Sequence, residues 1–216
     1  MEITSLIKLY FQTNEGITID VFDSKNIYNV YERIVGMLTQ YMEIETSVLQ
    51  AMSYCFYEML DNVLTHSGKE LGTVITRYDA PNHRLSFLIA DDGMGIRQSL
   101  SENEKYKNIS EEDALQECIK DSVTDGKGMG FGLYSSALLA HDAGLRFEIR
   151  SGEHSLLYNN DETKVIPSVS WQGTIVYMEL QTNKEINPNE MVMYRTDVAA
   201  EYNDLFLKDN EIEQLW

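Results

Sequence analysis

Three polar side chains follow one another at four-residue steps in the stretch EMLDNVLTH: Glu58, Asn62 and His66. Four residues make about one turn of an α-helix, so a helix here would carry all three on one face. A carboxylate could activate an attacking group for phosphate chemistry, and an amide oxygen one turn later suits Mg²⁺. The same stripe could be a solvated helix edge, and His66 alone could be a capping or packing residue. Other segments must decide between these interpretations.

A first glycine-containing segment, ADDGMGI, follows a strand-like stretch and contains Asp91, Gly93, Gly95 and Ile96. Alternating glycines permit a sharp turn and a close approach of the backbone to a ligand. An aspartate at a strand end can accept a hydrogen bond from an amino group such as that of adenine. The alternative is a plain surface turn.

A second segment, DGKGMGFGLY, places Gly126, Gly128, Gly130 and Gly132 at alternate positions directly before an apolar helix. Glycine amides and a helix N-terminus together favour an anion, and Lys127 adds a local positive charge. Met129, Phe131 and Leu133 complete the segment. A flexible hinge is the alternative. A dinucleotide-binding fingerprint is disfavoured, because no βαβ unit surrounds the glycines.

The hydrophobic pattern predicts the elements that would position these segments. Strands are expected at 16–22, 71–79, 84–92, 145–152, 154–160 and 173–181, with residues 3–11 pairing with the first of them. Helices are expected at 24–42 (Ser24 as N-cap), at 46–67 (ended by Gly68), from Ser110, and after the second glycine segment. The polar connection at 97–127 is long, which is typical of a functional lid.

Runs of strands without βαβ alternation predict an α+β fold, a two-layer sandwich with helices on one face of a mixed or antiparallel sheet. A doubly wound Rossmann sheet would need the missing alternation. One domain is expected at 1–182. An acidic tail follows at 183–216, either a partner-binding arm or a solvated extension.

The 216-residue chain carries 35 acidic and 17 basic residues, a net charge of -18. So negative a surface disfavours nucleic acids and anionic membranes as partners. A bound polyphosphate would have to be held by backbone amides, a helix N-terminus or a metal ion. Cys55 and Cys118 have no metal-type spacing; Cys55 is expected in the core, and a disulfide is the less favoured alternative. No signal peptide or bilayer-length apolar run is recognisable, which favours a cytoplasmic protein.

Taken in order, Glu-x-x-x-Asn on a helix, Asp-x-Gly-x-Gly after a strand, Gly-x-Gly-x-Gly-Leu opening a helix and the late strand GTIVYMEL resemble the ATP-binding domain of the GHKL superfamily. That group includes gyrase B, mismatch-repair ATPases, heat-shock chaperones and histidine kinases. The resemblance covers about residues 16–182. It implies the Bergerat type of sandwich, with ATP and Mg²⁺ as ligands and 97–127 as the ATP lid.

The resemblance also implies a role for each matching residue. Asn62 would ligate Mg²⁺, and Glu58 would occupy the position of the general base. Asp91 would bind the adenine amine, with Gly95 lining the base pocket. The phosphate turn and lid hinge would comprise Gly128, Gly130 and Gly132, and Thr174, after Gly173, would support the adenine end.

The stretch EMLDNVLTHSG looks most like the small anti-sigma-factor serine kinases of bacteria, while SEEDALQECIKDSVTDGKGMGFGL also resembles orphan histidine-kinase-like ATP-binding proteins. No histidine precedes His66, so phosphorylation of a histidine upstream in the same chain is not expected. Three functions stay open. The chain could be a regulatory protein kinase acting on a partner protein, a slow ATPase switch or a non-catalytic nucleotide sensor, and a homodimer is possible.

Overall fold

The fold is built on a five-stranded sheet in the order β1-β2-β3-β5-β4, with every neighbouring pair antiparallel. The computed structural model describes residues 3–43, 46–127, 132–142, 145–159 and 162–184. The strands are β1 (Ile17–Phe22), β2 (Gly72–Asp79), β3 (Arg84–Ala90), β4 (Arg146–Asn159) and β5 (Glu162–Gln181). Of the two sheet types left open by the sequence, the antiparallel one is present.

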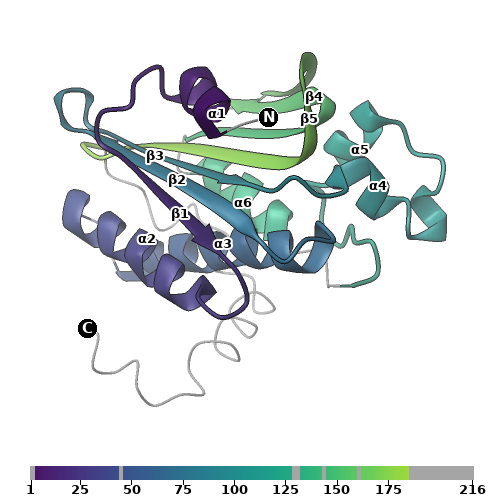
Figure 1. Cartoon of the computed structure of the whole chain (residues 1–216), viewed down its shortest axis with the longest axis horizontal. Helices are drawn as coiled ribbons and strands as arrows, with labels where there is room; N and C mark the ends of the chain where they lie inside the picture. The colour runs from purple at the N-terminus through teal and green to yellow at the C-terminus, as the bar shows by residue number, and fades with distance from the viewer. Residues whose placement is uncertain (1–2, 44–45, 128–131, 143–144, 160–161, 185–216) are drawn as a thin grey trace.

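Three helices cover one face of this sheet: α2 (Ile27–Tyr41), α3 (Thr46–His66) and α6 (Gly132–Asp142) (Figure 1). Their apolar sides meet β1–β5 in the main core, where Leu38, Met52, Phe56, Leu60 and Phe87 are almost fully buried. The predicted two-layer α+β sandwich is therefore confirmed. Gly68, at φ +72°, follows the end of α3, as expected for a glycine in the left-handed region.

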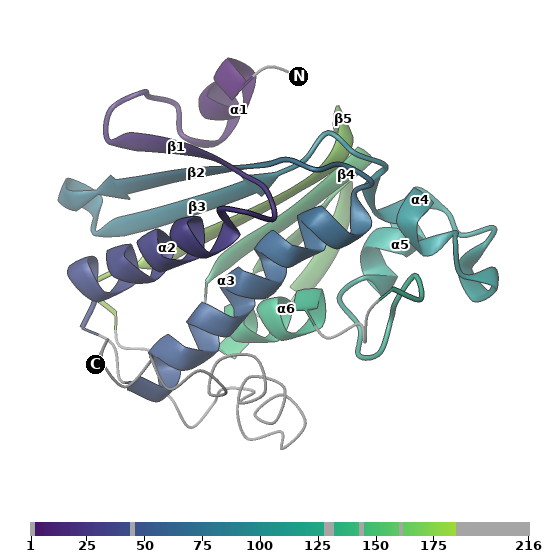
Figure 2. The ribbon, with the colours of Figure 1, turned by 60° about the horizontal axis from the view of Figure 1, so that its bottom comes forward.

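The prediction that residues 3–11 pair with β1 is wrong, because they form the helix α1 (Ile3–Tyr10). This helix lies on the face of the sheet opposite α2, α3 and α6 (Figure 2). Leu6, Ile7 and Phe11 pack there in a second apolar cluster with the strand residues Ile75 and Tyr177. Their spacing of one, four and five residues suits one side of a helix, and the helix buries a sheet face that would otherwise expose apolar side chains.

The last strands are longer than predicted. Residues 145–152 and 154–160 were expected as separate strands, but β4 runs through both, and β5 begins eleven residues before Gly173. Two register shifts interrupt the pairing at Ser151, Gly152 and His154. The polar residues between the apolar runs misled the strand prediction, because a bulge allows a strand to continue through them.

The connection at 97–127 contains more structure than the single helix expected. It carries α4 (Gly95–Leu100), a 3-10 turn at Glu104–Tyr106 and α5 (Glu111–Glu117). The start of α5 is confirmed, since the Ser110 hydroxyl accepts a hydrogen bond from the Asp113 amide. Ser24 is not the N-cap of α2; that position is Asn26.

The acidic tail, apart from residues 183 and 184, lies outside the described residues. Within the described part of the chain, none of the helices has the length and hydropathy needed to cross a bilayer.

The packing of α1 generates a first prediction. Leu6 is 2% exposed and Leu9, on the same helix, is 41% exposed. Leu6→Ala should lower the free energy of unfolding by about 2 kcal/mol or more, because it removes buried methyl groups and leaves a cavity. Leu9→Ala, the matched control, should change it by less than about 0.5 kcal/mol. Urea denaturation followed by circular dichroism measures both, and equal values would show that α1 does not stabilise the sheet.

Candidate functional site

The polar stripe of α3 faces a cavity with a volume of about 380 Å³. Glu58, Asn62 and His66 all line it, so the stripe is not a solvated helix edge. Further lining comes from Asp91, directly after β3, and from Thr174, in the middle of β5. The α3 helix is straight enough to present three successive turns to one space because no proline or glycine interrupts residues 46–66.

Asn62 has a buried side-chain amide nitrogen that finds no hydrogen-bond partner among the described residues. A buried and unpaired amide is costly unless something else satisfies it. The two ends of an asparagine amide exchange by a simple flip, so the unpaired end could equally offer its oxygen. Asn62 therefore fits a ligand in the cavity, including a cation.

A cation site here would depend on oxygens that the protein does not itself supply. Among the described residues, no group of three or more histidine, cysteine or acidic side chains is arranged to hold a metal ion. Mg²⁺ normally takes one or two protein oxygens and completes its shell with water and substrate phosphates. Asn62 alone fits that pattern, provided that a phosphate ligand is bound.

Asp91 brings a carboxylate to the cavity wall although its residue is only 6% exposed. Burial raises the pKa of Asp91 to about 6, against the opposing effect of hydrogen bonds from the Gly93 and Thr174 amides. The Gly93 amide donates to Asp91 Oδ1 over 2.8 Å. The carboxylate is thus fixed in place and partly desolvated, which strengthens any hydrogen bond that it accepts from a ligand amino group.

The glycines around Asp91 are required by close contacts. A Cβ on Gly93 would lie 2.1 Å from the main-chain oxygen of Ser67, at the end of α3. Gly95 has φ +73°, and its added Cβ would lie 2.6 Å from Ser151 Oγ. Gly173 has φ +101°, and its Cβ would lie 2.3 Å from the main-chain oxygen of Asp91. A plain surface turn would not need this fit, so the turn at 91–96 is built into the wall of the site.

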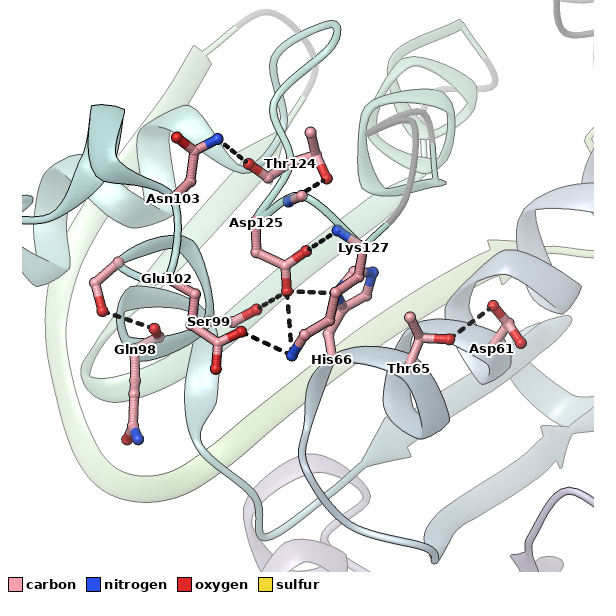
Figure 3. A network of polar contacts seen from close by, with 12 residues as sticks. Asp61, Thr65, His66, Gln98, Ser99, Glu102, Asn103, Thr124, Asp125 and Lys127 are labelled. Atoms are coloured by element: carbon pink, nitrogen blue, oxygen red, sulfur yellow. Dashed lines mark hydrogen bonds and ion pairs between the residues drawn. The ribbon is translucent and has the colours of Figure 1, made fainter.

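A second carboxylate, that of Asp125, connects three parts of the site (Figure 3). Its Oδ2 lies 2.7 Å from His66 Nδ1 on α3 and accepts a hydrogen bond of 2.8 Å from the Ser99 hydroxyl on α4. Its Oδ1 accepts one of 2.9 Å from the Lys127 amide. Burial alone would raise the pKa of Asp125, but these hydrogen bonds outweigh burial, and its pKa lies below the usual value. The network ties the end of the 97–127 connection to α3 and α4.

Lys127 lines the cavity, but its charge is already engaged. Its Nζ lies 2.8 Å from Glu102 Oε2 and 3.9 Å from Asp125 Oδ2. An anion in the cavity would therefore compete with Glu102 for this lysine. The expectation that a polyphosphate cannot rely on a lysine cluster agrees with this arrangement.

Both cysteines are buried and unpaired, so the prediction for Cys55 is confirmed and a disulfide is excluded. Burial raises the pKa of each thiol to about 12. Cys118 also lines the cavity, where a neutral thiol acts as an apolar wall.

The structure brings together most of the residues that the sequence predicted for the site. Those lining the cavity are Glu58, Asn62, Asp91, Gly95, Ile96, Lys127, Leu133 and Thr174. Gly93 packs against the end of α3 instead, and Gly132 begins α6. Gly128, Met129, Gly130 and Phe131 lie outside the described residues, so their predicted contacts with phosphate stay predictions.

Sequence patterns missed the polar residues that support these. Ser99 and Asp125 stand in the long connection, where no periodicity marks them, and Ser151, Trp171 and Gln172 stand on β4 and β5. Their contacts span up to 80 positions of the chain, which a local pattern cannot reveal. Among these residues, only Asp125 had a recognisable position in the sequence, directly before the second glycine segment.

An antiparallel sheet is covered by α3, and an asparagine on this helix and the aspartate after β3 line one cavity. Residues 48–184 match the family of histidine kinase-, DNA gyrase B- and HSP90-like ATPases. The match spans more than half of the 216 residues, and the chain belongs to this family. No curated protein matches the sequence. The GHKL-type domain and its ATP binding are thereby supported, whereas the resemblance to anti-sigma-factor kinases stays a prediction.

Replacing Asp91 should raise the stability of the ligand-free protein and lower its affinity for ATP. The raised pKa of Asp91 means that the folded state binds a proton more tightly than the unfolded chain, so stability decreases as the pH rises through about 6. Asp91→Asn should make the ligand-free protein more stable at pH 7, on the order of 1–2 kcal/mol. This advantage should vanish near pH 4, where the wild-type carboxyl is protonated.

The same variant should bind ATP about tenfold or more weakly, because the charged acceptor is lost. Thermal unfolding at pH 4 and 7 and titration calorimetry with ATP measure the two effects. Equal ATP affinity would show that Asp91 does not contact the base.

The contribution of Asp125 to stability should depend on pH in the opposite direction from that of Asp91. Because the pKa of Asp125 is lowered in the folded state, its contribution is present above its unfolded pKa of about 4 and is lost as the pH falls below that value. Asp125→Asn should lower the free energy of unfolding by about 1–3 kcal/mol at pH 7, since His66 and Ser99 lose a charged acceptor. The difference in the free energy of unfolding between variant and wild type, measured by urea titration, should become smaller as the pH falls from 5 to 3. A difference independent of pH would argue against the network.

Proposed function

We propose that this protein binds Mg-ATP and transfers the γ-phosphoryl group to a hydroxyl of a partner protein, as a regulatory kinase in bacterial signalling. The proposal is supported by one arrangement above all. Glu58, Asn62 and Asp91 line the same cavity of about 380 Å³, from α3 on one side and the end of β3 on the other. Asp91 would supply a carboxylate for the adenine base, Asn62 an amide for a cation, and Glu58 a second carboxylate one helical turn before Asn62. This chemistry requires all three groups.

Each residue has a proposed task. Asp91 accepts a hydrogen bond from the adenine amine, with Gly95, Ile96 and Thr174 around the base. Asn62 offers its amide oxygen to Mg²⁺, which when bound would screen the charge of the phosphates. Glu58, one turn before Asn62, accepts the proton of the attacking hydroxyl. Lys127 leaves Glu102 for a phosphate oxygen, and the glycines at 128, 130 and 132 line the phosphates.

The partner supplies the acceptor hydroxyl. The acidic surface, with a net charge of -18, favours a partner with a basic contact surface. We further propose a cytoplasmic location, with a second copy of the chain as a possible additional partner.

A slow ATPase switch is the second candidate. It is favoured by the Asp125 network, which connects the 97–127 segment to α3. A rearrangement of this segment over a bound nucleotide would therefore change the surface that a partner could contact. In that case Glu58 would activate water instead of a hydroxyl. A nucleotide sensor without turnover is the third.

Incubation of the purified protein with Mg-ATP, with and without cell extract from its source, separates these functions. Labelled phosphate on another protein supports the kinase, phosphate release supports the ATPase, and binding without either supports the sensor. The absence of adenine-nucleotide binding would overturn all three.

Glu58→Ala should retain ATP affinity within about threefold and lose turnover at least a hundredfold, since it removes the base and not the binding groups. Glu32→Gln, an exposed glutamate on α2, is the control and should leave turnover unchanged. Initial rates with saturating Mg-ATP give the comparison. Wild-type rates in Glu58→Ala would remove this residue from the base role.

A further inference from the structure

The turn at 91–96, which carries Asp91, is held by a main-chain hydrogen bond of 2.9 Å from the Met94 amide to Ser67 and by three side chains of β4 and β5. Trp171 Nε1 donates to the main-chain oxygen of Asp91 over 2.8 Å. Gln172 Nε2 donates to the main-chain oxygen of Gly93 over 2.6 Å. Ser151 Oγ accepts a hydrogen bond of 2.9 Å from the Ile96 amide. The three donors and acceptors come from β4 and β5, at least 55 positions away from the turn in the chain.

These side chains reach the turn because the β4–β5 pairing is irregular at this point. Ser151 pairs with Thr174, but the next residue, Gly152, pairs with Trp171, so Gln172 and Gly173 form extra residues on β5. A bulge of this kind bends a strand and redirects its side chains. Here it turns Trp171 and Gln172 towards the turn, and the hydroxyl of Ser151 donates back to Gly173 over 2.9 Å.

Packing surrounds only part of the turn. Gly93 lies against the main chain of Ser67, but Gly95 and Ile96 line both the cavity of about 380 Å³ and a smaller one of about 180 Å³. A segment that borders open space gains less from close packing than one enclosed by side chains. The geometry of the turn therefore depends on these hydrogen bonds as well as on the contact with Ser67.

The hydrogen bonds of Trp171 and Ser151 are well shielded from water, whereas Gln172 is exposed. Trp171 and Ser151 are each 5% exposed, and the Trp171 ring belongs to the second apolar cluster with Ile175 and Leu88. Removing the donor of a buried acceptor lowers the stability of the folded protein, because water cannot replace that donor. The main-chain oxygen of Asp91 would be such an acceptor.

We infer that Ser151, Trp171 and Gln172 are positioning residues that hold the Asp91 turn in the geometry that selects an adenine amine over a base carrying a carbonyl group at the same position. None of the three needs to touch the nucleotide. The inference rests on the proposed binding of adenine nucleotides, and it assigns base selectivity to residues behind the binding wall.

Adenine and hypoxanthine differ at one position of the base, where the first has a hydrogen-bond donor and the second an acceptor. Adenine presents an amino group, a donor, to the Asp91 carboxylate, whereas hypoxanthine presents a carbonyl oxygen, an acceptor. A rigid carboxylate rejects the carbonyl because two acceptors face each other without a proton between them. A carboxylate on a loosened turn can move away, so the selectivity falls more than the affinity.

The test compares the dissociation constants of ATP and inosine triphosphate by calorimetry, each with Mg²⁺. Trp171→Phe keeps an aromatic ring in the apolar cluster and removes the donor. Ser151→Ala is a second variant that removes the other support with a minimal change of volume. Val169→Ala, 61% exposed on the same strand, is the matched control. Circular dichroism and thermal unfolding establish that each variant is folded.

Wild type and Val169→Ala should prefer ATP by about tenfold or more, and Trp171→Phe and Ser151→Ala should each reduce that ratio by about fivefold or more. A ratio that stays at the wild-type value, whether or not both affinities fall together, would overturn the inference, because the residues would then act on stability alone. If wild type binds neither nucleotide, the proposed function itself fails, and this outcome differs from a selective wild type with equally selective variants.

Discussion

The hydrogen-bond ladder between β3 and β5 decides where a site can form in this molecule. It pairs Ala90 with Ile175, and directly beyond it the Asp91 amide donates to the main-chain oxygen of Thr174 over 3.0 Å. The ladder ends there because Gly93 and Gly95 turn the chain away. Asp91 thus follows the last paired residue of β3, whereas Thr174 lies within β5 and pairs with Ser151 of β4, and both line the cavity beside α3. The helix supplies the opposite wall, and both walls belong to the same core.

Within this frame, two buried carboxylates behave in opposite ways. Asp91 has its pKa raised by burial, and Asp125 has its pKa lowered by hydrogen bonds that outweigh burial. The first accepts hydrogen bonds from the Gly93 and Thr174 amides but stays partly desolvated at the cavity wall, at the expense of stability. The second is fully occupied by His66, Ser99 and the Lys127 amide and holds the surrounding elements together. Such a division is expected when one acidic group serves binding and another serves architecture.

The sequence predicted the groups that line the cavity better than the structure that supports them. Glu58 and Asn62 share a helical period and Asp91 stands beside glycines, so local spacing marked them as candidates, whereas Thr174 was assigned by the resemblance to the GHKL superfamily. Residues 3–11 were wrongly assigned to a strand, because a short apolar run fits either period until its packing partner is known. Ser151, Trp171 and Asp125 could not be found, since their contacts depend on a bulge and on a loop path that only tertiary structure defines.

The helix α1 lies outside the stretch of chain that matches the ATPase family, which starts at residue 48. Yet the Tyr10 hydroxyl donates to Glu148 over 2.9 Å, and the same carboxylate oxygen accepts a hydrogen bond from Arg150. A fragment trimmed to the matched stretch would leave that ion pair and the apolar residues Leu88 and Ile175 open to solvent on the back of the sheet. The stretch that matches the family is therefore shorter than the part of the chain that packs around the sheet, and an expression fragment cut at the match would carry an exposed, aggregation-prone surface.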